Sequence, residues 1–186
     1  MLKYSTNEDK KLIQVGKRMR KGSSIYLVEA PSEFQRVWFP GTSKIKDMEK
    51  LVQEEIVLFS LPSTLTLDNE VFIQYFENDE DYDEEISKNI VFVHYLDVSA
   101  SKTILECITR NTPIIVNKLE AVVEYLGENY PLYYKSLDDV SSLLTNEKIE
   151  AAHEHLKNMD KEELTVLTLA KKLQNLIYKN FQKADS

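Results

Sequence analysis

Residues 90–95 read Ile90-Val-Phe-Val-His-Tyr95, an almost uninterrupted run of apolar and aromatic side chains. A strand that is apolar at successive positions is buried on both faces, as the central strand of a parallel sheet is. Residues 100–110 predict a helix after this strand, and residues 113–116 predict a second apolar strand. The stretch 90–116 therefore predicts a β-α-β unit, in which a right-handed crossover places two parallel strands side by side.

The same alternation of strand and helix extends along the rest of the chain. Residues 23–29 predict a brief helix or strand, and closing helices are expected from residue 136. Further strands are predicted at 11–15, 36–39, 71–76 and 132–134, and further helices at 45–55, 80–88, 120–126 and 161–181. This order predicts an α/β protein with a Rossmann-like, doubly wound parallel sheet, folded as a single three-layer domain with extra C-terminal helices.

The length of the chain sets its domain organisation. It has 186 residues, of which 42% are hydrophobic and 29% charged, and these values are typical of one globular domain. We expect a tail over residues 1–10, a Rossmann-like domain over 11–145, helices packed on it over 146–181, and a tail over 182–186.

Charge and cysteine content exclude some classes of protein. Lys and Arg number 23 against 31 Asp and Glu, and the resulting net charge of −8 disfavours non-specific nucleic-acid binding. The single cysteine, Cys107, excludes an internal disulfide and is typical of a reducing compartment. The first eleven residues lack the apolar core of a secretory signal, and no apolar stretch approaches the roughly 20 residues of a membrane span. We therefore expect a cytoplasmic protein.

Polar side chains gather where the predicted helix 100–110 begins. Ser99, Ser101 and Thr103 supply hydroxyls there, and a helix start also carries unpaired N–H groups and the positive end of the helix dipole, which together can hold a phosphate. Lys102 would add positive charge, and Glu106, one turn further, could accept hydrogen bonds from a ribose diol. The alternative is an ordinary N-cap followed by a surface glutamate.

Two motifs resemble those of a known family. The stretch Glu106-Cys-Ile-Thr-Arg-Asn-Thr-Pro-Ile-Ile-Val116, followed by Glu120-Ala-Val-Val-Glu-Tyr-Leu-Gly127, resembles the donor-binding motif of GT-B glycosyltransferases. The segment Val15-Gly-Lys-Arg-Met-Arg-Lys-Gly22 is similar to the family's Gly, Arg and Lys-Gly segment after the first strand of its C-terminal half. The resemblance covers roughly residues 11–181, which is one of the family's two Rossmann-like domains. The acceptor-binding domain is the missing half.

The resemblance implies that the chain binds a nucleotide-diphosphate sugar as a donor substrate for glycosyl transfer. Glu106 would bind the ribose, Asp97 would lie near the sugar, and the segment from Ser99 to Thr103 would present amides to the phosphates. Cations must offset the charge of the leaving diphosphate, a role that falls to Arg18 and Lys21. The substrate-binding residues implied are Arg18, Lys21, Asp97, Ser99, Ser101, Lys102, Thr103 and Glu106.

The same resemblance limits what the chain does alone. The family's general base usually comes from the other half, so no catalytic residue is assigned, and neither a metal nor a cofactor is implied. An acceptor-binding protein or a second copy of the chain is the expected partner. The glycines that let backbone approach the phosphates are replaced by Ser99, Ala100 and Ser101, and Asn111 stands at a glycine position, where asparagine tolerates a positive φ. The alternative is a non-catalytic α/β protein-interaction module that retains the fold.

Other polar groups have simpler interpretations. The acidic run at 77–85 lacks the glycine and closing glutamate of a calcium loop, so we interpret it as a solvated helix start. Cys107 is expected to be a small buried residue, and His94 either contacts the ligand or is a hydrogen-bonded core imidazole. His153 and His155 are two residues apart and do not share a helix face, so they do not predict a metal site.

Overall fold

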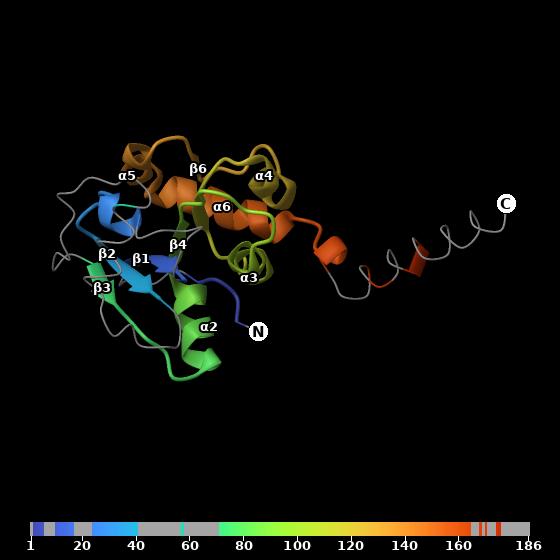
Figure 1. Cartoon of the computed structure of the whole chain (residues 1–186), viewed down its shortest axis with the longest axis horizontal. Helices are drawn as coiled ribbons and strands as arrows, with labels where there is room; N and C mark the ends of the chain where they lie inside the picture. The colour runs from blue at the N-terminus through green and yellow to red at the C-terminus, as the bar shows by residue number, and fades with distance from the viewer. Residues whose placement is uncertain are drawn as a thin grey trace.

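The computed structural model describes residues 2–5, 10–16, 24–40, 57, 71–164, 168, 170 and 174–175. Six parallel strands form one sheet in the order β3-β2-β1-β4-β5-β6 (Figure 1). The strands are β1 (Lys10–Val15), β2 (Phe34–Phe39), β3 (Val71–Ile73), β4 (Ile90–Val93), β5 (Ile114–Asn117) and β6 (Tyr133–Tyr134). The predicted Rossmann-like, doubly wound parallel sheet is confirmed.

Two strands are shorter than their apolar patterns predict. β3 ends at Ile73 and β4 at Val93, although the apolar residues continue to positions 76 and 95. Beyond β4 the backbone of Tyr95 bonds to the side chain of Asn117, with Tyr95 N donating to Oδ1 at 2.8 Å and Nδ2 donating to Tyr95 O at 2.8 Å. A side chain thus replaces the next strand as the partner of that backbone, which ends the ladder there.

The helices lie where the sequence predicts them, wherever the structure describes them. They are η1 (Ser24–Leu27), α2 (Asp79–Lys88), α3 (Lys102–Arg110), α4 (Glu120–Leu126), η2 (Leu137–Asp139), α5 (Val140–Leu143), α6 (Asn146–Asn158) and η3 (Glu162–Leu164). The predicted helix at 45–55 and most of the one at 161–181 lie outside the described residues. The proposed domain boundaries stay predictions.

The direction of the crossovers determines which face each helix covers. The connections β3–β4, β4–β5 and β5–β6 all run the same way across the sheet, so right-handed crossovers place α2, α3 and α4 on one face, as Figure 1 shows. On the other face, the Gln14 side chain accepts a hydrogen bond from Ile25 N of η1 at 2.8 Å. Successive side chains of a strand alternate, so Val15 and its register partner Phe39 point toward α2 and α3.

The closing helix α6 braces the amino-terminal edge of the sheet. Asn146 Oδ1 accepts from Lys10 Nζ at 2.9 Å, and His153 Nδ1 and His155 Nε2 each lie 2.8 Å from a backbone oxygen, of Asn111 and Leu126 respectively. Asn111 has a φ of 61°, the left-handed conformation that the sequence predicts for it. The carboxyl-terminal edge, away from α6, holds the candidate site. No described helix has the length and apolar character needed to cross a lipid bilayer.

Candidate functional site

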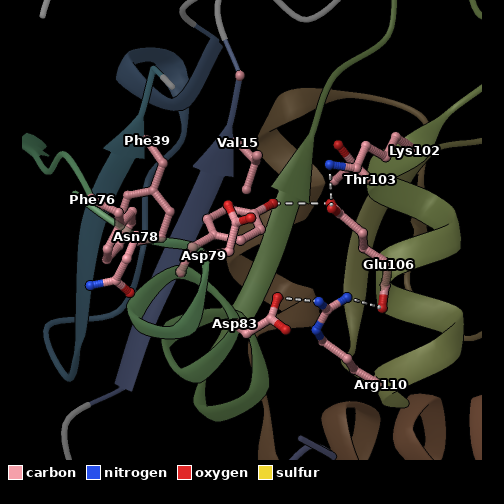
Figure 2. A pocket seen from close by; sticks show the side chains of 12 residues that line it. Val15, Phe39, Phe76, Asn78, Asp79, Asp83, Lys102, Thr103, Glu106 and Arg110 are labelled. Carbon is pink, nitrogen blue, oxygen red and sulfur yellow. Dashed lines mark hydrogen bonds and ion pairs between the residues drawn. The ribbon is translucent and has the colours of Figure 1, made fainter. Parts of the chain in front are cut away.

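A cavity of about 670 Å³ lies between α2 and α3 at the carboxyl ends of β1 and β2 (Figure 2). We call it the α2–α3 pocket. It borders the place where β1 and β4 are neighbours and their connections leave in opposite directions, which is where open α/β sheets bind ligands. Its lining residues are Val15, Gly16, Phe39, Phe76, Asn78, Asp79, Tyr82, Asp83, Lys102, Thr103, Glu106 and Arg110.

One wall of the pocket is aromatic. The rings of Phe39 and Phe76 meet edge to face with centroids 4.6 Å apart, and Tyr82 lies 5.9 Å from Phe76 and 6.5 Å from Phe39. These three residues come from the end of β2, the loop after β3 and the first turns of α2. Aromatic rings offer an apolar surface on which the face of a planar ring can stack.

The end of β1 lies beside this wall. Gly16 has a φ of 94°, a left-handed conformation that glycine adopts without the steric cost of a side chain. Its N–H donates to Phe39 O at 2.7 Å, and its carbonyl accepts from Trp38 Nε1 at 2.8 Å. These bonds hold the glycine against β2 at the mouth of the pocket.

Glu106 presents its carboxylate to the pocket from α3. Its side chain is only 14% exposed, and Oε1 lies 3.2 Å from Lys102 Nζ. Tyr82, across the pocket on α2, donates its hydroxyl to Oε2 at 3.0 Å (Figure 2). Burial, and then the nearby Glu106 carboxylate, raise the pKa of Tyr82, so the phenol keeps its proton and remains the donor in this pair. The pocket therefore contains a fixed acceptor for hydroxyl groups.

A second ionic pair closes the inner end of the pocket. Arg110, whose side chain is 7% exposed, forms an ion pair through NH2 with Asp83 of α2, which is 31% exposed. Its NH1 also donates to the Glu106 carbonyl at 3.3 Å, while its Nε has no hydrogen-bond partner among the residues that the structure describes. The pair joins the same two helices as the Tyr82–Glu106 bond, one turn further along α3.

The acidic run at 77–85 is only partly a solvated helix start. Asn78 is the N-cap of α2 and accepts from Asp81 N at 2.8 Å, and most of the acidic side chains are exposed. Asp83 and Glu85 are half-buried instead, because they pair with Arg110 and Lys11, the latter at 2.8 Å. A charge pattern does not reveal such pairs, since their partners lie far away in the sequence.

The hydroxyl of Ser101 stabilises the start of α3. Ser101 is the N-cap: its Oγ accepts from Ile104 N at 3.1 Å and also hydrogen-bonds to the hydroxyl of Tyr95. Burial raises the pKa of Tyr95 to about 12, so that hydroxyl stays neutral. Lys102 is exposed and Thr103 is buried, and both line the α2–α3 pocket.

Asp97 lies in a different depression. It lines a shallow hollow of about 330 Å³ between the ends of β4 and β5, together with Leu96, Leu119 and Glu124, which we call the β4–β5 hollow. The structure thus brings Lys102, Thr103 and Glu106 together and places Asp97 apart from them; Ser99 is exposed and lines neither cavity. Arg18 and Lys21 lie outside the described residues, and the roles of all eight residues stay predictions.

Sequence reasoning missed most of the pocket lining, above all the residues from α2. Tyr82 is the single aromatic residue in the acidic run at 77–85, which is an odd composition for a fully solvated helix. Arg110 lies four residues after Glu106 and therefore on the same face of α3. Both signals are weak without knowledge that α2 and α3 are neighbours.

The remaining polar candidates have structural roles. His94 Nδ1 lies 2.8 Å from the hydroxyl of Tyr134, which donates to Val93 O at 3.2 Å, and burial lowers the pKa of His94. Cys107 is fully buried, as expected. Within the described part of the chain, no three His, Cys, Asp or Glu side chains group in a way that could hold a metal ion.

The fold is similar to that of several solved structures, although no protein-family model and no curated protein matches the sequence. Anabaena Alr3699/HepE in complex with UDP-glucose is 14% identical with a TM-score of 0.64, and the match covers 93% of this chain and 49% of that one. The same protein in complex with UDP gives 12% identity, a TM-score of 0.65, and 92% and 49% coverage. The α,α-trehalose 6-phosphate synthase from Burkholderia multivorans gives 10% identity, a TM-score of 0.56, and 96% and 44% coverage.

These matches concern architecture. The chain spans about half the length of each of these proteins, and the similar proteins are GT-B glycosyltransferases. The part of this chain that matches them holds an all-parallel sheet in the order β3-β2-β1-β4-β5-β6, with the switch point at its central strands β1 and β4. This chain therefore has the fold of a single Rossmann-like half of a GT-B glycosyltransferase.

Proposed function

We propose that this chain is the nucleotide-sugar-binding half of a GT-B glycosyltransferase, and that the nucleotide occupies the α2–α3 pocket. The observation that carries the proposal is the Glu106 carboxylate, 14% exposed and directed into a cavity of about 670 Å³ at the switch point of the sheet. A cavity of that size is suited to a small molecule such as a nucleotide. A buried carboxylate is costly unless hydrogen-bond donors face it, and a ribose diol supplies two.

The walls of the pocket suit the other parts of a nucleoside diphosphate. The aromatic wall formed by Phe39, Phe76 and Tyr82 would stack against the base, since every base offers a π face. The phosphates would lie toward the amino end of α3, where the helix dipole and Lys102 favour negative charge. In this arrangement Glu106 contacts the ribose between them.

Several predicted residues take different places in this proposal. The hydroxyl of Ser101 already caps α3, so this residue would serve the phosphates by fixing the helix start. Asp97 lies in the β4–β5 hollow and would contact only a sugar that extends beyond the pocket. Arg18 and Lys21 follow β1 in the sequence and would offset the charge of the diphosphate.

Glycosyl transfer by this chain would need a second half. Proteins with a similar fold are about twice its length, and HepE has been crystallised with UDP-glucose bound. The proposed activity is therefore transfer of a sugar from a nucleotide donor, completed by an acceptor-binding domain in a longer chain or in a partner protein.

Nucleotide binding tests the proposal directly. We expect UDP, GDP or their sugar derivatives to raise the melting temperature, because a ligand that binds only the folded state stabilises it. Glu106→Gln should weaken that binding at least tenfold, because the amide replaces one acceptor oxygen by a donor. Glu147→Gln is the matched control, since Glu147 is exposed at the start of α6, lines neither cavity and should leave binding unchanged.

The outcome separates the two candidate functions. Binding that depends on Glu106 but not on Glu147 supports the nucleotide-binding half. If no nucleotide or nucleotide sugar shifts the melting temperature, the proposal fails, and the alternative of a protein-interaction module that retains the fold takes its place.

A further inference from the structure

A hydrogen bond between Tyr82 and Glu106 crosses the α2–α3 pocket from helix to helix, nearer the amino end of α3 than the Arg110–Asp83 pair. Tyr82 on α2 donates to Oε2 of Glu106 on α3 at 3.0 Å (Figure 2). The two residues are 24 positions apart and lie on elements separated by β4, so the bond exists only because the fold places both helices on one face. The bond joins the hydroxyl of Tyr82, a residue of the aromatic wall, to the Glu106 carboxylate, which in the proposed function accepts hydrogen bonds from the ribose.

The Tyr82 hydroxyl is held more firmly than the other partner of Glu106. Its ring is half-buried and packs edge to face against Phe76 and Phe39, with centroids 5.9 and 6.5 Å away. Lys102, by contrast, is 89% exposed on a long flexible side chain, so its contact with Oε1 orders the carboxylate weakly. The orientation of the carboxylate is therefore determined mainly by Tyr82.

The chemistry of the phenol suits it to this task. Burial and the adjacent carboxylate raise the pKa of Tyr82, so it donates its proton throughout the neutral pH range. A carboxylate has about four acceptor positions, and a single donor on Oε2 leaves the others available. Glu106 can therefore accept hydrogen bonds from two further hydroxyls without losing its contact with Tyr82.

We propose that Tyr82 is a positioning residue that holds the Glu106 carboxylate ready for the ribose diol, and so makes the pocket discriminate ribose from deoxyribose. This inference rests on the proposed function, because it assigns the ribose to Glu106. A free glutamate would lose rotamer freedom on binding, and a side chain fixed in advance loses less. The benefit should be largest with ligands whose 2′- and 3′-hydroxyls both reach the carboxylate, and smaller with 2′-deoxy ligands, which keep one of the two.

The test compares each diphosphate with its deoxy counterpart. Affinities for UDP and GDP and for 2′-deoxy-UDP and 2′-deoxy-GDP are measured by calorimetry on the wild-type chain, Tyr82→Phe and Glu106→Gln. The matched control is Tyr133→Phe, which removes a hydroxyl that donates to Gly127 O at 2.9 Å outside the pocket. We expect a preference for ribose of at least tenfold in the wild type and in Tyr133→Phe, and below about threefold in Tyr82→Phe.

A second variant, Phe76→Leu, keeps the inference testable if Tyr82→Phe fails to fold. Phe76→Leu keeps both hydrogen-bonding groups but removes the ring that packs on Tyr82, and it should also lower the preference for ribose. A change in base stacking would weaken the ribose and deoxyribose forms equally, and so would leave the ratio of their affinities unchanged. The ratio therefore reports the positioning of Glu106 and not the general integrity of the pocket.

The results distinguish this inference from the proposed function. If the wild-type chain binds none of the four nucleotides, both fail. If the wild type prefers ribose and Glu106→Gln removes that preference, but Tyr82→Phe and Phe76→Leu retain it, the nucleotide site stands and the role of Tyr82 is refuted. A preference that falls in Tyr82→Phe and persists in Tyr133→Phe supports the inference, whereas one that a folded Tyr82→Phe retains refutes it.

Discussion

The two cavities at the carboxyl edge of the sheet differ in depth and in lining. The α2–α3 pocket has about 670 Å³ and contains a buried carboxylate and an aromatic wall. The β4–β5 hollow has about 330 Å³, and its polar side chains are the acidic residues Asp97, Glu120 and Glu124. Both lie beyond the carboxyl ends of strands, where helices begin. Open α/β sheets bind their ligands at such places, so both cavities are candidate ligand sites.

The connections of the strands explain the difference. β1 and β4 are neighbours whose connections lead to opposite sides of the sheet, to β2 and to β5, which makes their carboxyl ends the switch point of the sheet. β4 and β5 continue in the same direction, and the side chain of Asn117 closes the gap by bonding both the N–H and the carbonyl of Tyr95 at 2.8 Å. The strand order therefore places the larger cavity at the switch point and the smaller one beside strands that continue in one direction.

The largest expected effect concerns the bonds that close the β4–β5 side. Asn117→Ala removes both partners of the Tyr95 backbone, and polar groups that lose their partners in a partly buried place cost about 1–3 kcal/mol each. We expect the free energy of unfolding to fall by about 3 kcal/mol, measured by urea denaturation. Asn129→Ala, at an exposed turn, should change it by less than about 0.5 kcal/mol. Equal losses in the two variants would contradict this explanation of the closed side.

The pattern of apolar residues predicted the fold well. Buried strands on both sides of α3, with Ser101 before the helix and Asn111 after it, identify a β-α-β unit without knowledge of distant contacts. The end of β4 was less predictable, because Asn117, which bonds the backbone of Tyr95 just beyond it, is 22 residues away in the sequence. Apolar content shows that a segment is buried, but the partners of its backbone depend on tertiary structure.

Of the residues that line the candidate site, the sequence predicted only residues on α3. Lys102, Thr103 and Glu106 lie on one helix, where spacing alone places them near each other. Tyr82, Phe76 and the other residues of the opposite wall belong to segments that the sheet order brings to α3. Asp97 follows the end of a strand just as the residues of the α2–α3 pocket do, and the direction of the crossovers separates the two places.

A smaller effect, on the β4 side, concerns pH. Burial lowers the pKa of His94, so the folded chain resists protonation of this imidazole while the unfolded chain accepts a proton below about pH 6.5. The unfolded state then binds more protons, and stability falls as the pH drops through that value toward the lower pKa of the folded state. Free energies of unfolding at pH 5.5 and 7.5 should differ less in His94→Asn than in the wild type; an equal difference would assign the pH dependence to other groups.

The smallest effect on stability belongs to the open pocket. Lys102 is 89% exposed, and an ion pair at such a position contributes about 0–1 kcal/mol, so Lys102→Met should leave the urea midpoint almost unchanged. Nucleotide binding should respond more strongly, because the ammonium lies at the amino end of α3, where the diphosphate is expected.

We expect Lys102→Met to weaken UDP binding about fivefold at low ionic strength and less at 0.5 M salt, since salt screens exposed charges. Lys118→Met is the matched control. Lys118 pairs with Glu128 at the end of β5, and its loss lowers the net charge of the chain by the same amount without affecting the pocket. If both variants weaken binding equally, the phosphates respond to the overall charge of the chain, and the amino end of α3 has no special role in holding them.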